Sequence, residues 1–179
     1  MREPEAAEPD YWTFVDHAVR SVSETLPEVD PDAMRLVMTL HRATDLLSYD
    51  LHARLGEIKL NESAQLSSTG LRLLLVLSAS GPLELRRVAA LSGMSRAAVS
   101  AAVENLAANG LVGKEPSQED RRTVLLQLTP EGQETFARCF AAYNAGEQHW
   151  AATLTAEERG QLVGLLTKLM QTQDVQRRA

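Results

Sequence analysis

The sequence predicts a mainly α-helical protein with a small β-wing. Leu and Ala are abundant and aromatic residues make up only 4% of the chain, a composition that favours helices packed on helices. Several apolar segments with a helical period begin at capping residues. Two short apolar segments late in the chain, 111–115 and 123–128, have the composition of paired strands.

The N-terminal part predicts two helices. The first runs from about Tyr11 to Leu26, before Pro27. Asp30-Pro31-Asp32 then supplies a capping acid, a proline suited to the first helical turn and a second acid near the positive helix end. The second helix carries an apolar stripe formed by Leu36, Leu40, Ala43, Leu47, Leu51, Leu55 and Ile58. A helix this long in a small protein usually has another helix, often from a second chain, covering part of it.

The middle of the chain predicts short helices joined by sharp turns. A very apolar helix at 71–77 follows Ser67-Ser68-Thr69 and is stopped by Ser80-Gly81-Pro82. The next two helices, 85–91 and 95–108, are joined by the tight connection Ser92-Gly93-Met94. Asn109-Gly110 closes the second of them as a left-handed C-cap. This order is that of a helix-turn-helix.

A hairpin and two helices complete the chain. The polar run 116–121 joins the two predicted strands. Thr129-Pro130-Glu131 starts the next helix by cap, proline and acid. The last helix opens at Thr155, where Glu158 completes a capping box.

The net charge of −6 is distributed unevenly. Residues 1–30 hold two basic and eight acidic side chains, so this extension accounts for the whole acidic excess. Residues 84–122 hold six basic and five acidic side chains. Global charge bears on solubility and steering, so it does not exclude nucleic-acid binding. It does predict a modest non-specific affinity for DNA.

Bulk features bound the class of protein. The acidic N-terminus lacks a signal-peptide pattern, and no segment approaches the roughly 18 apolar residues of a membrane span. Cys139 is the only cysteine, which excludes an intrachain disulfide framework. We therefore expect a cytoplasmic protein with no membrane partner. Neither a Gly-rich phosphate loop nor a Gly-x-Ser-x-Gly elbow is present, so we expect no enzyme activity and no cofactor.

The helix that begins near residue 95 has the features of a DNA recognition helix. Ser95 can cap free backbone N–H groups, and Arg96 is long enough to reach a base edge or a phosphate. Small and polar neighbours allow close entry into the major groove. The candidate DNA contacts on this helix are Ser95, Arg96, Ala97, Ala98 and Ser100.

Basic residues outside that helix extend the candidate surface. Arg121 and Arg122 sit where the hairpin tip should project, toward phosphates or a narrow minor groove. Arg86 and Arg87 could touch phosphates or could simply be solvated. Lys114, on the first predicted strand, completes the candidate contacts. The alternative is a winged-helix module that makes protein contacts without binding DNA.

These segments resemble the MarR family of winged helix-turn-helix transcriptional regulators. The stretch 91–100 is similar to the family's recognition helix, and Glu119-Asp120-Arg121-Arg122 with Leu128-Thr129 is similar to its wing. The resemblance covers about residues 32–172. It implies a homodimer, a palindromic double-stranded DNA operator and small-molecule or redox control, with repression relieved by ligand. It also implies that Asp120 braces the wing while Arg122 enters the minor groove.

The resemblance and the segments together divide the chain into three expected regions. Residues 1–29 form an acidic N-terminal extension with a helix. Residues 30–66 and 130–179 form a helical dimerisation region. Residues 67–129 form the winged helix-turn-helix DNA-binding lobe.

Polar side chains beside the long apolar stripe are candidate ligand contacts. His41, Asp45, Tyr49 and His52 follow one another at steps of four, four and three, so they share one helix face. They could line an effector pocket, or they could form a solvated or inter-subunit hydrogen-bonding edge. No tight His, Asp and Glu cluster completes a coordination shell, so no metal site is predicted.

Trp12 and Arg72 add to the candidate ligand site. Trp12 lies in an extension similar to the extra helix of the urate-responsive subgroup, in which a Trp contributes to the ligand site. The alternative role of Trp12 is packing at the dimer surface. That subgroup carries an acidic residue where this chain has Arg72, which argues against urate. Arg72 could pair with an acidic ligand or with Asp45, so we expect a small acidic or aromatic effector.

Cys139 is predicted to be a core residue. It follows Phe136 by three positions and precedes Tyr143 by four, which places it on the apolar face of its helix. A redox-responsive regulator that uses Cys139 is the alternative.

Overall fold

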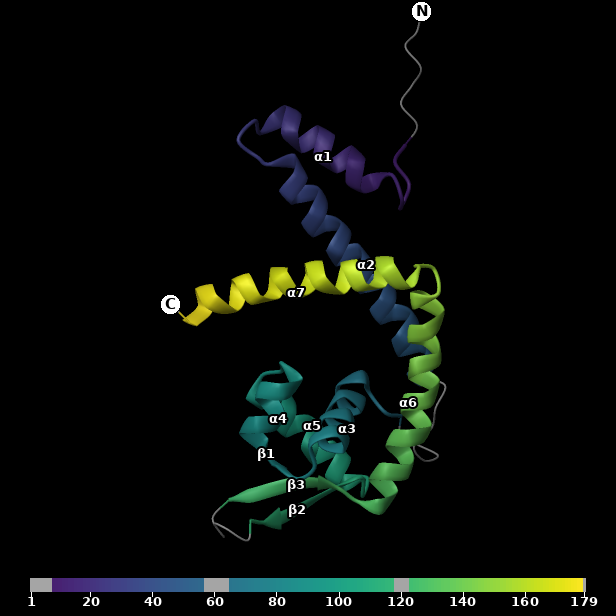
Figure 1. Cartoon of the computed structure of the whole chain (residues 1–179), viewed down its shortest axis with the longest axis vertical. Helices are drawn as coiled ribbons and strands as arrows, with labels where there is room; N and C mark the ends of the chain where they lie inside the picture. The colour runs from purple at the N-terminus through teal and green to yellow at the C-terminus, as the bar shows by residue number, and fades with distance from the viewer. Residues whose placement is uncertain (1–7, 57–64, 118–122, 179) are drawn as a thin grey trace, which may run out of the picture. The chain divides into compact units, whose positions relative to one another are not determined.

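The computed structural model describes residues 8–56, 65–117 and 123–178 (Figure 1). The chain divides into two compact units, Met1–Tyr49 and Asp50–Ala179, and each is described by itself. Among the described residues, no helix is long and apolar enough to cross a lipid bilayer.

The N-terminal unit holds α1 (Phe14–Thr25) and the first part of α2 (Pro31–Gly56). Helix α1 begins later than Tyr11, where the sequence predicts it, because Asp10 Oδ1 accepts hydrogen bonds from the backbone N–H groups of Trp12 and Thr13. These bonds hold the preceding residues in a turn.

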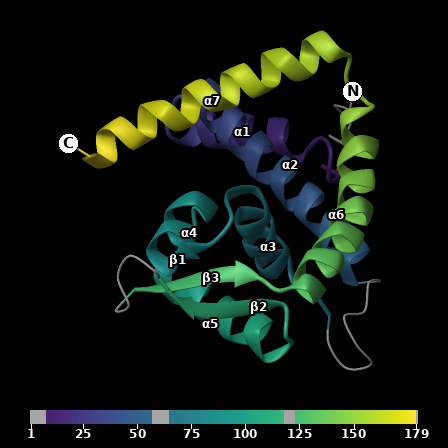
Figure 2. The same ribbon diagram turned by 60° about the horizontal axis from the view of Figure 1, so that its bottom comes forward.

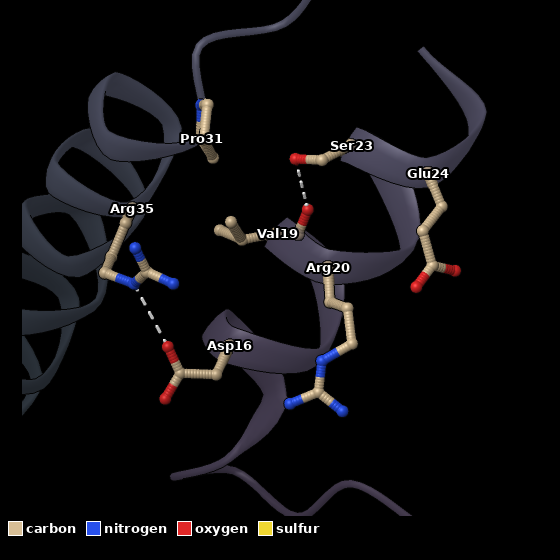
Figure 3. A pocket seen from close by; sticks show the side chains of 7 residues that line it. All are labelled: Asp16, Val19, Arg20, Ser23, Glu24, Pro31 and Arg35. Atoms are coloured by element: carbon tan, nitrogen blue, oxygen red, sulfur yellow. Dashed lines mark hydrogen bonds and ion pairs between the residues drawn. The ribbon is translucent and has the colours of Figure 1, made fainter. Parts of the chain in front are cut away.

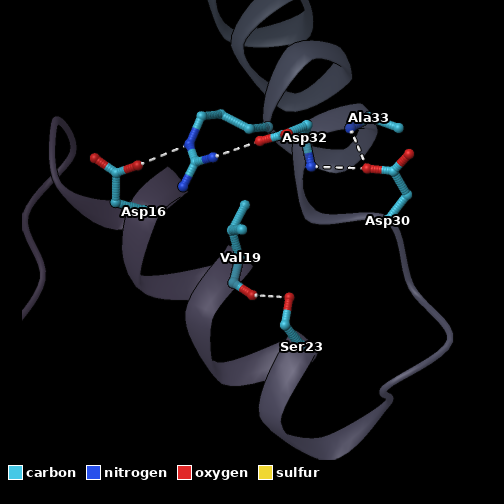
Figure 4. Close-up of polar contacts among 7 residues, drawn as sticks. Asp16, Val19, Ser23, Asp30, Asp32 and Ala33 are labelled. Atoms are coloured by element: carbon cyan, nitrogen blue, oxygen red, sulfur yellow. Dashed lines mark hydrogen bonds and ion pairs between the residues drawn. The ribbon is translucent and has the colours of Figure 1, made fainter.

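The start of α2 is the one that the sequence predicts. Asp30 Oδ1 accepts from the backbone N–H groups of Asp32 and Ala33 at 2.9 and 3.0 Å (Figure 4). Arg35, one turn into α2, contacts Asp16 of α1 at 3.1 Å and Asp32 at 3.3 Å. The first of these ion pairs joins the two helices, and the second lies within α2. Both are exposed, so each adds little stability.

The second unit contains the helix-turn-helix and a small sheet. Its elements after α2 are α3 (Ser68–Ser80), β1 (Leu83–Glu84), α4 (Leu85–Ser92), α5 (Arg96–Ala108), β2 (Val112–Pro116), β3 (Val124–Leu128), α6 (Pro130–Ala151) and α7 (Ala156–Arg178). The mainly helical fold class with a small β-wing is confirmed. Figure 2 shows α3, α4 and α5 grouped beside the sheet, and these helices contact one another and its strands.

The sheet has three antiparallel strands in the order β1-β3-β2. The sequence predicts only the β2–β3 pair, in which Val112 lies opposite Leu128. The third strand, β1, has two residues, with Leu83 opposite Leu126 and Glu84 opposite Leu125. A strand of two residues is too short to show the alternating pattern that identifies strands in a sequence. It forms because β3 offers an edge with which it can pair.

The core of this unit lies among α3, α4, α5, α6 and the strands. Its largest fully buried side chains are Leu55, Leu73, Leu74, Leu106, Val88, Val99, Val103 and Cys139. The long stripe on α2 is buried only toward its C-terminal end, where Leu51 and Leu55 are 5% and 1% exposed. Leu36 is 53% exposed, and Ile58 lies outside the described residues.

Two glycines set the geometry around the helix-turn-helix. Gly93 adopts φ +69° between α4 and α5, a conformation that other residues reach only with strain. Gly132, in the first turn of α6, lies against Leu111, and a Cβ there would stand 2.0 Å from the Leu111 carbonyl oxygen. The start of α6 is therefore packed directly on the chain that enters β2.

Candidate nucleic-acid interface and effector cavity

Helix α5 presents an exposed first turn above a buried inner face. Ser95 is its N-cap, and its Oγ accepts a hydrogen bond from the Ala98 N–H at 3.2 Å. Val99 and Val103, on the inner face, are 0% and 1% exposed. The predicted contacts Ser95, Arg96, Ala97 and Ala98 are all exposed, whereas Ser100 is half-buried.

The charge at this helix end is suited to an anion. No acidic residue lies in the first turn of α5, and Arg96 is its first residue. The backbone dipoles of a helix give its N-terminus a partial positive charge. The first turn of α5 therefore offers a positive end and a guanidinium together, as phosphate contacts require.

The turn before α5 is held by a buried serine. Ser92 Oγ donates to the Ala89 carbonyl oxygen at 3.2 Å and accepts from the Met94 N–H at 3.4 Å. With Gly93 in the left-handed region, these bonds fix the direction in which α5 leaves α4.

The other predicted DNA contacts differ in their surroundings. Arg86 is exposed but forms an ion pair with Glu84 at 2.5 Å, so part of its charge is already compensated. Lys114 is exposed on β2. The wing residues Asp120, Arg121 and Arg122 lie outside the described residues.

A cavity of about 140 Å³ lies between α3 and α6. Its lining comes from Ser68, Leu71, Arg72, Leu75, Phe140, Tyr143 and Glu147. His52 forms a hydrogen bond with Ser68 at the cavity wall. Of the predicted ligand residues, Arg72 lines this cavity and His52 contacts its lining residue Ser68.

Three cavity residues on α6 are not among the ligand contacts predicted from the sequence. Phe140, Tyr143 and Glu147 follow one another at steps of three and four, so they share a helix face. The signal in the sequence that could indicate them is two aromatic residues and a carboxylate on one helix face. Burial raises the pKa of Tyr143, the Glu147 charge raises it further, and Arg72 opposes both effects. The phenol therefore stays protonated at neutral pH.

Four predicted ligand residues lie in the N-terminal unit and are exposed. Trp12 and Tyr49 are 77% and 80% exposed, and His41 and Asp45 are exposed as well. Within the described residues, no group of three or more His, Cys, Asp and Glu side chains could hold a metal ion.

A larger cavity, of about 590 Å³, lies between α1 and α2. Figure 3 shows that charged side chains dominate its lining, with Arg35 directed to Asp16. Val19 is its buried apolar member, and the Ser23 hydroxyl is bonded to the Val19 carbonyl. No residue of this cavity is among the predicted ligand contacts.

Cys139 is a core residue, as the sequence predicts. Its side chain is 0% exposed and belongs to the main apolar cluster. Burial raises the pKa of its thiol, an effect that the neighbouring Arg138 only partly opposes. A buried thiol with a raised pKa is a poor nucleophile.

The capped α5, the sharp turn before it and the sheet after it define a winged helix-turn-helix protein. Residues 64–123 match the family model described as MarR family. YwaE of Bacillus subtilis, an uncharacterized helix-turn-helix-type transcriptional regulator, is 27% identical over 156 residues, 86% of this chain and 88% of YwaE. A putative transcriptional regulatory protein for the hcr operon of Thauera aromatica is 36% identical over 76 residues, 42% of this chain and 46% of that protein.

A solved structure agrees with these sequence matches. The PcaV transcriptional regulator of Streptomyces coelicolor, in complex with its natural ligand, is 26% identical with a TM-score of 0.62, over 80% of this chain and 96% of PcaV. Along most of its length the chain is therefore similar to transcriptional regulators, and its residues 64–123 match the MarR family. The resemblance that the sequence predicts is thereby confirmed.

Proposed function

We propose that this chain is a homodimeric, sequence-specific DNA-binding repressor that a small molecule releases from a palindromic operator. The observation that carries the proposal is the first turn of α5. There Arg96 and two alanines are exposed at an acid-free helix N-terminus, while the next residue, Val99, is buried. A long cation beside small side chains can enter the major groove and reach a base edge.

The other DNA contacts are proposed in two groups. Lys114 and Arg86 are exposed and would meet phosphates, Arg86 only when it leaves Glu84. Asp120, Arg121 and Arg122 are proposed from the sequence alone, with Arg122 as the minor-groove contact. The DNA-binding lobe at 67–129 and a cytoplasmic location likewise stay predictions from the sequence.

Dimerisation is proposed from the surface of α7. In the described part of this helix no side chain is buried, and it exposes Leu162, Val163, Leu165, Leu169 and Met170. A helix is stabilised in proteins mainly by burial of an apolar face. A second copy of this chain, whose α2 also exposes Leu36 and Val37, would supply that cover. The two recognition helices would then read half-sites about one helical turn apart.

Small-molecule control is proposed through α3. This helix supplies four residues of the α3–α6 cavity and also packs on α4 and α5. A ligand that shifts α3 would therefore also shift the helix-turn-helix formed by α4 and α5. PcaV, which is similar along most of its length, is known with its natural ligand bound. Release from DNA by a ligand is the mode of control that we infer.

Selection of bound sequences from a random duplex pool tests the DNA-binding proposal. The full-length chain should enrich a symmetric site, and Arg96→Ala should bind that site at least tenfold more weakly. Arg138→Ala, which removes an exposed arginine from α6, serves as the matched control and should bind as the wild type does. Failure to enrich any sequence would instead favour the protein-interaction module.

A further inference from the structure

The α3–α6 cavity presents two opposite charges that are not paired with each other. Arg72 reaches it from α3 and Glu147 from α6. Among the ion pairs of the described residues, none joins these two groups. Glu147 accepts one hydrogen bond, from Asn144 Nδ2 at 2.7 Å. The Glu147 charge raises the pKa of the Tyr143 phenol, and the Arg72 charge lowers it.

Apolar side chains form one wall of this cavity, and its volume limits the size of a ligand. Leu71 is 4% exposed, and Leu75 and Phe140 complete the apolar wall. A volume of about 140 Å³ is close to that of cavities that hold one benzene ring. Ser68 also lines the cavity, but His52 already engages its hydroxyl. Besides the Tyr143 phenol, the polar groups that the lining offers a ligand are therefore the Arg72 guanidinium and the Glu147 carboxylate.

We propose that this cavity selects an amphoteric molecule of about one ring, with an acidic group on Arg72 and a protonated amine on Glu147. The inference rests on the proposed ligand control and names the ligand's chemistry. Arg72 supplies affinity for the acid, since a guanidinium binds carboxylates with paired hydrogen bonds. Glu147 is the specificity-determining residue.

The discrimination against simple acids follows from electrostatics. A ligand that carries only a carboxylate would place a second negative charge near Glu147, whose hydrogen-bond partner Asn144 is neutral. A ligand with an ammonium group relieves that repulsion and pairs the carboxylate. Selectivity therefore arises because the wrong ligand leaves the Glu147 carboxylate without a positive charge beside it.

Binding of matched ring compounds to the full-length protein tests this inference. The probes are the ortho, meta and para isomers of aminomethylbenzoate, each compared with the methylbenzoate of the same substitution. Calorimetric titration without DNA gives affinities directly. At least one aminomethyl isomer should bind the wild type ten times or more tightly than its methyl counterpart.

Two variants separate the roles of the charges. Glu147→Gln should remove the preference by weakening the aminomethyl compound and strengthening the methyl one, and Arg72→Gln should weaken both. Glu134→Gln, another α6 carboxylate that is exposed, is the control and should keep the wild-type preference.

The inference is overturned if no probe binds at 10 mM, about the weak limit for a one-ring ligand, or if Glu147→Gln leaves the preference unchanged. Thermal unfolding confirms that each variant is folded. Operator binding is measured on the same samples, so loss of DNA binding would identify a failure of the proposed function rather than of the ligand class.

Discussion

The Trp150 indole Nε1–H donates a hydrogen bond to Asp50 Oδ2 across 2.9 Å, joining α6 to α2 over 100 positions of sequence. Arg54 donates to the same carboxylate oxygen at 3.0 Å. Gly146 packs beneath this group, where a Cβ would stand 2.7 Å from Arg54 Cδ. The end of α2 is thus held to α6 by one carboxylate with two donors.

Asp50 should make the stability of this junction depend on pH. The bond from Arg54, followed by the bond from Trp150, lowers the pKa of Asp50. A lowered folded-state pKa contributes stability above the ordinary aspartate range, and this stability is lost as the pH falls through the folded-state value. Asp50→Asn should therefore lower the urea midpoint at pH 7, and the deficit should shrink below about pH 4. A deficit that is equal at pH 7 and pH 3.5 would contradict this account.

Loss of the Ser95 cap should destabilise the recognition helix. Ser95→Ala removes the acceptor of the Ala98 N–H and should cost about 1 kcal/mol of unfolding free energy, measured by urea titration. Ser95→Asn keeps a capping oxygen and should stay within about 0.5 kcal/mol of the wild type. If the two variants lose equal stability, Ser95 does not act as a cap.

The turn between α4 and α5 should require glycine for conformation, not for space. No atom lies within 4 Å of a Cβ built at Gly93, but φ is +69°. Gly93→Ala should therefore cost about 1–2 kcal/mol. Gly160 lies within α7, and a Cβ built there also meets no atom within 4 Å. Gly160→Ala should therefore raise stability by up to about 1 kcal/mol, because alanine favours the helix more than glycine does. Opposite shifts in thermal midpoint are the expected result, and shifts of the same sign would refute it.

The exposed apolar face of α7 should hold the dimer together. Leu165 is 66% exposed, and Leu165→Asp should convert the protein to a monomer in sedimentation velocity at micromolar concentration, since a buried charge without a partner opposes association. Gln161→Asp adds the same charge at an exposed polar position and should leave the dimer intact. If the wild type sediments as a monomer, the proposal that two recognition helices bind two half-sites is contradicted.

Local signals predicted most of the elements, because caps act through neighbouring residues. Asp30, Ser95 and Thr129 each accept the backbone N–H bonds that their positions require. Thr155 and Glu158 form the predicted capping box, with the Thr155 N–H donating to Glu158 at 2.7 Å.

Features that depend on distant segments were not predictable in the same way. Strand β1 exists because its two residues meet the free edge of β3. Of the residues that line the α3–α6 cavity, only Arg72 is among the predicted ligand contacts, since Tyr143 and Glu147 lie on a helix some 70 positions later. Periodicity assigns residues to a helix face but does not name the helix that the face meets.

The most direct test of the central claim is an anisotropy titration of the full-length protein on duplex DNA from upstream of its own gene, at 150 mM salt. A duplex of the same composition in shuffled order is the comparison. A specific regulator should bind the upstream DNA with a Kd below 1 µM, at least roughly 10³-fold tighter than the shuffled duplex. Equal binding of the two duplexes, or none below micromolar protein, would contradict the account.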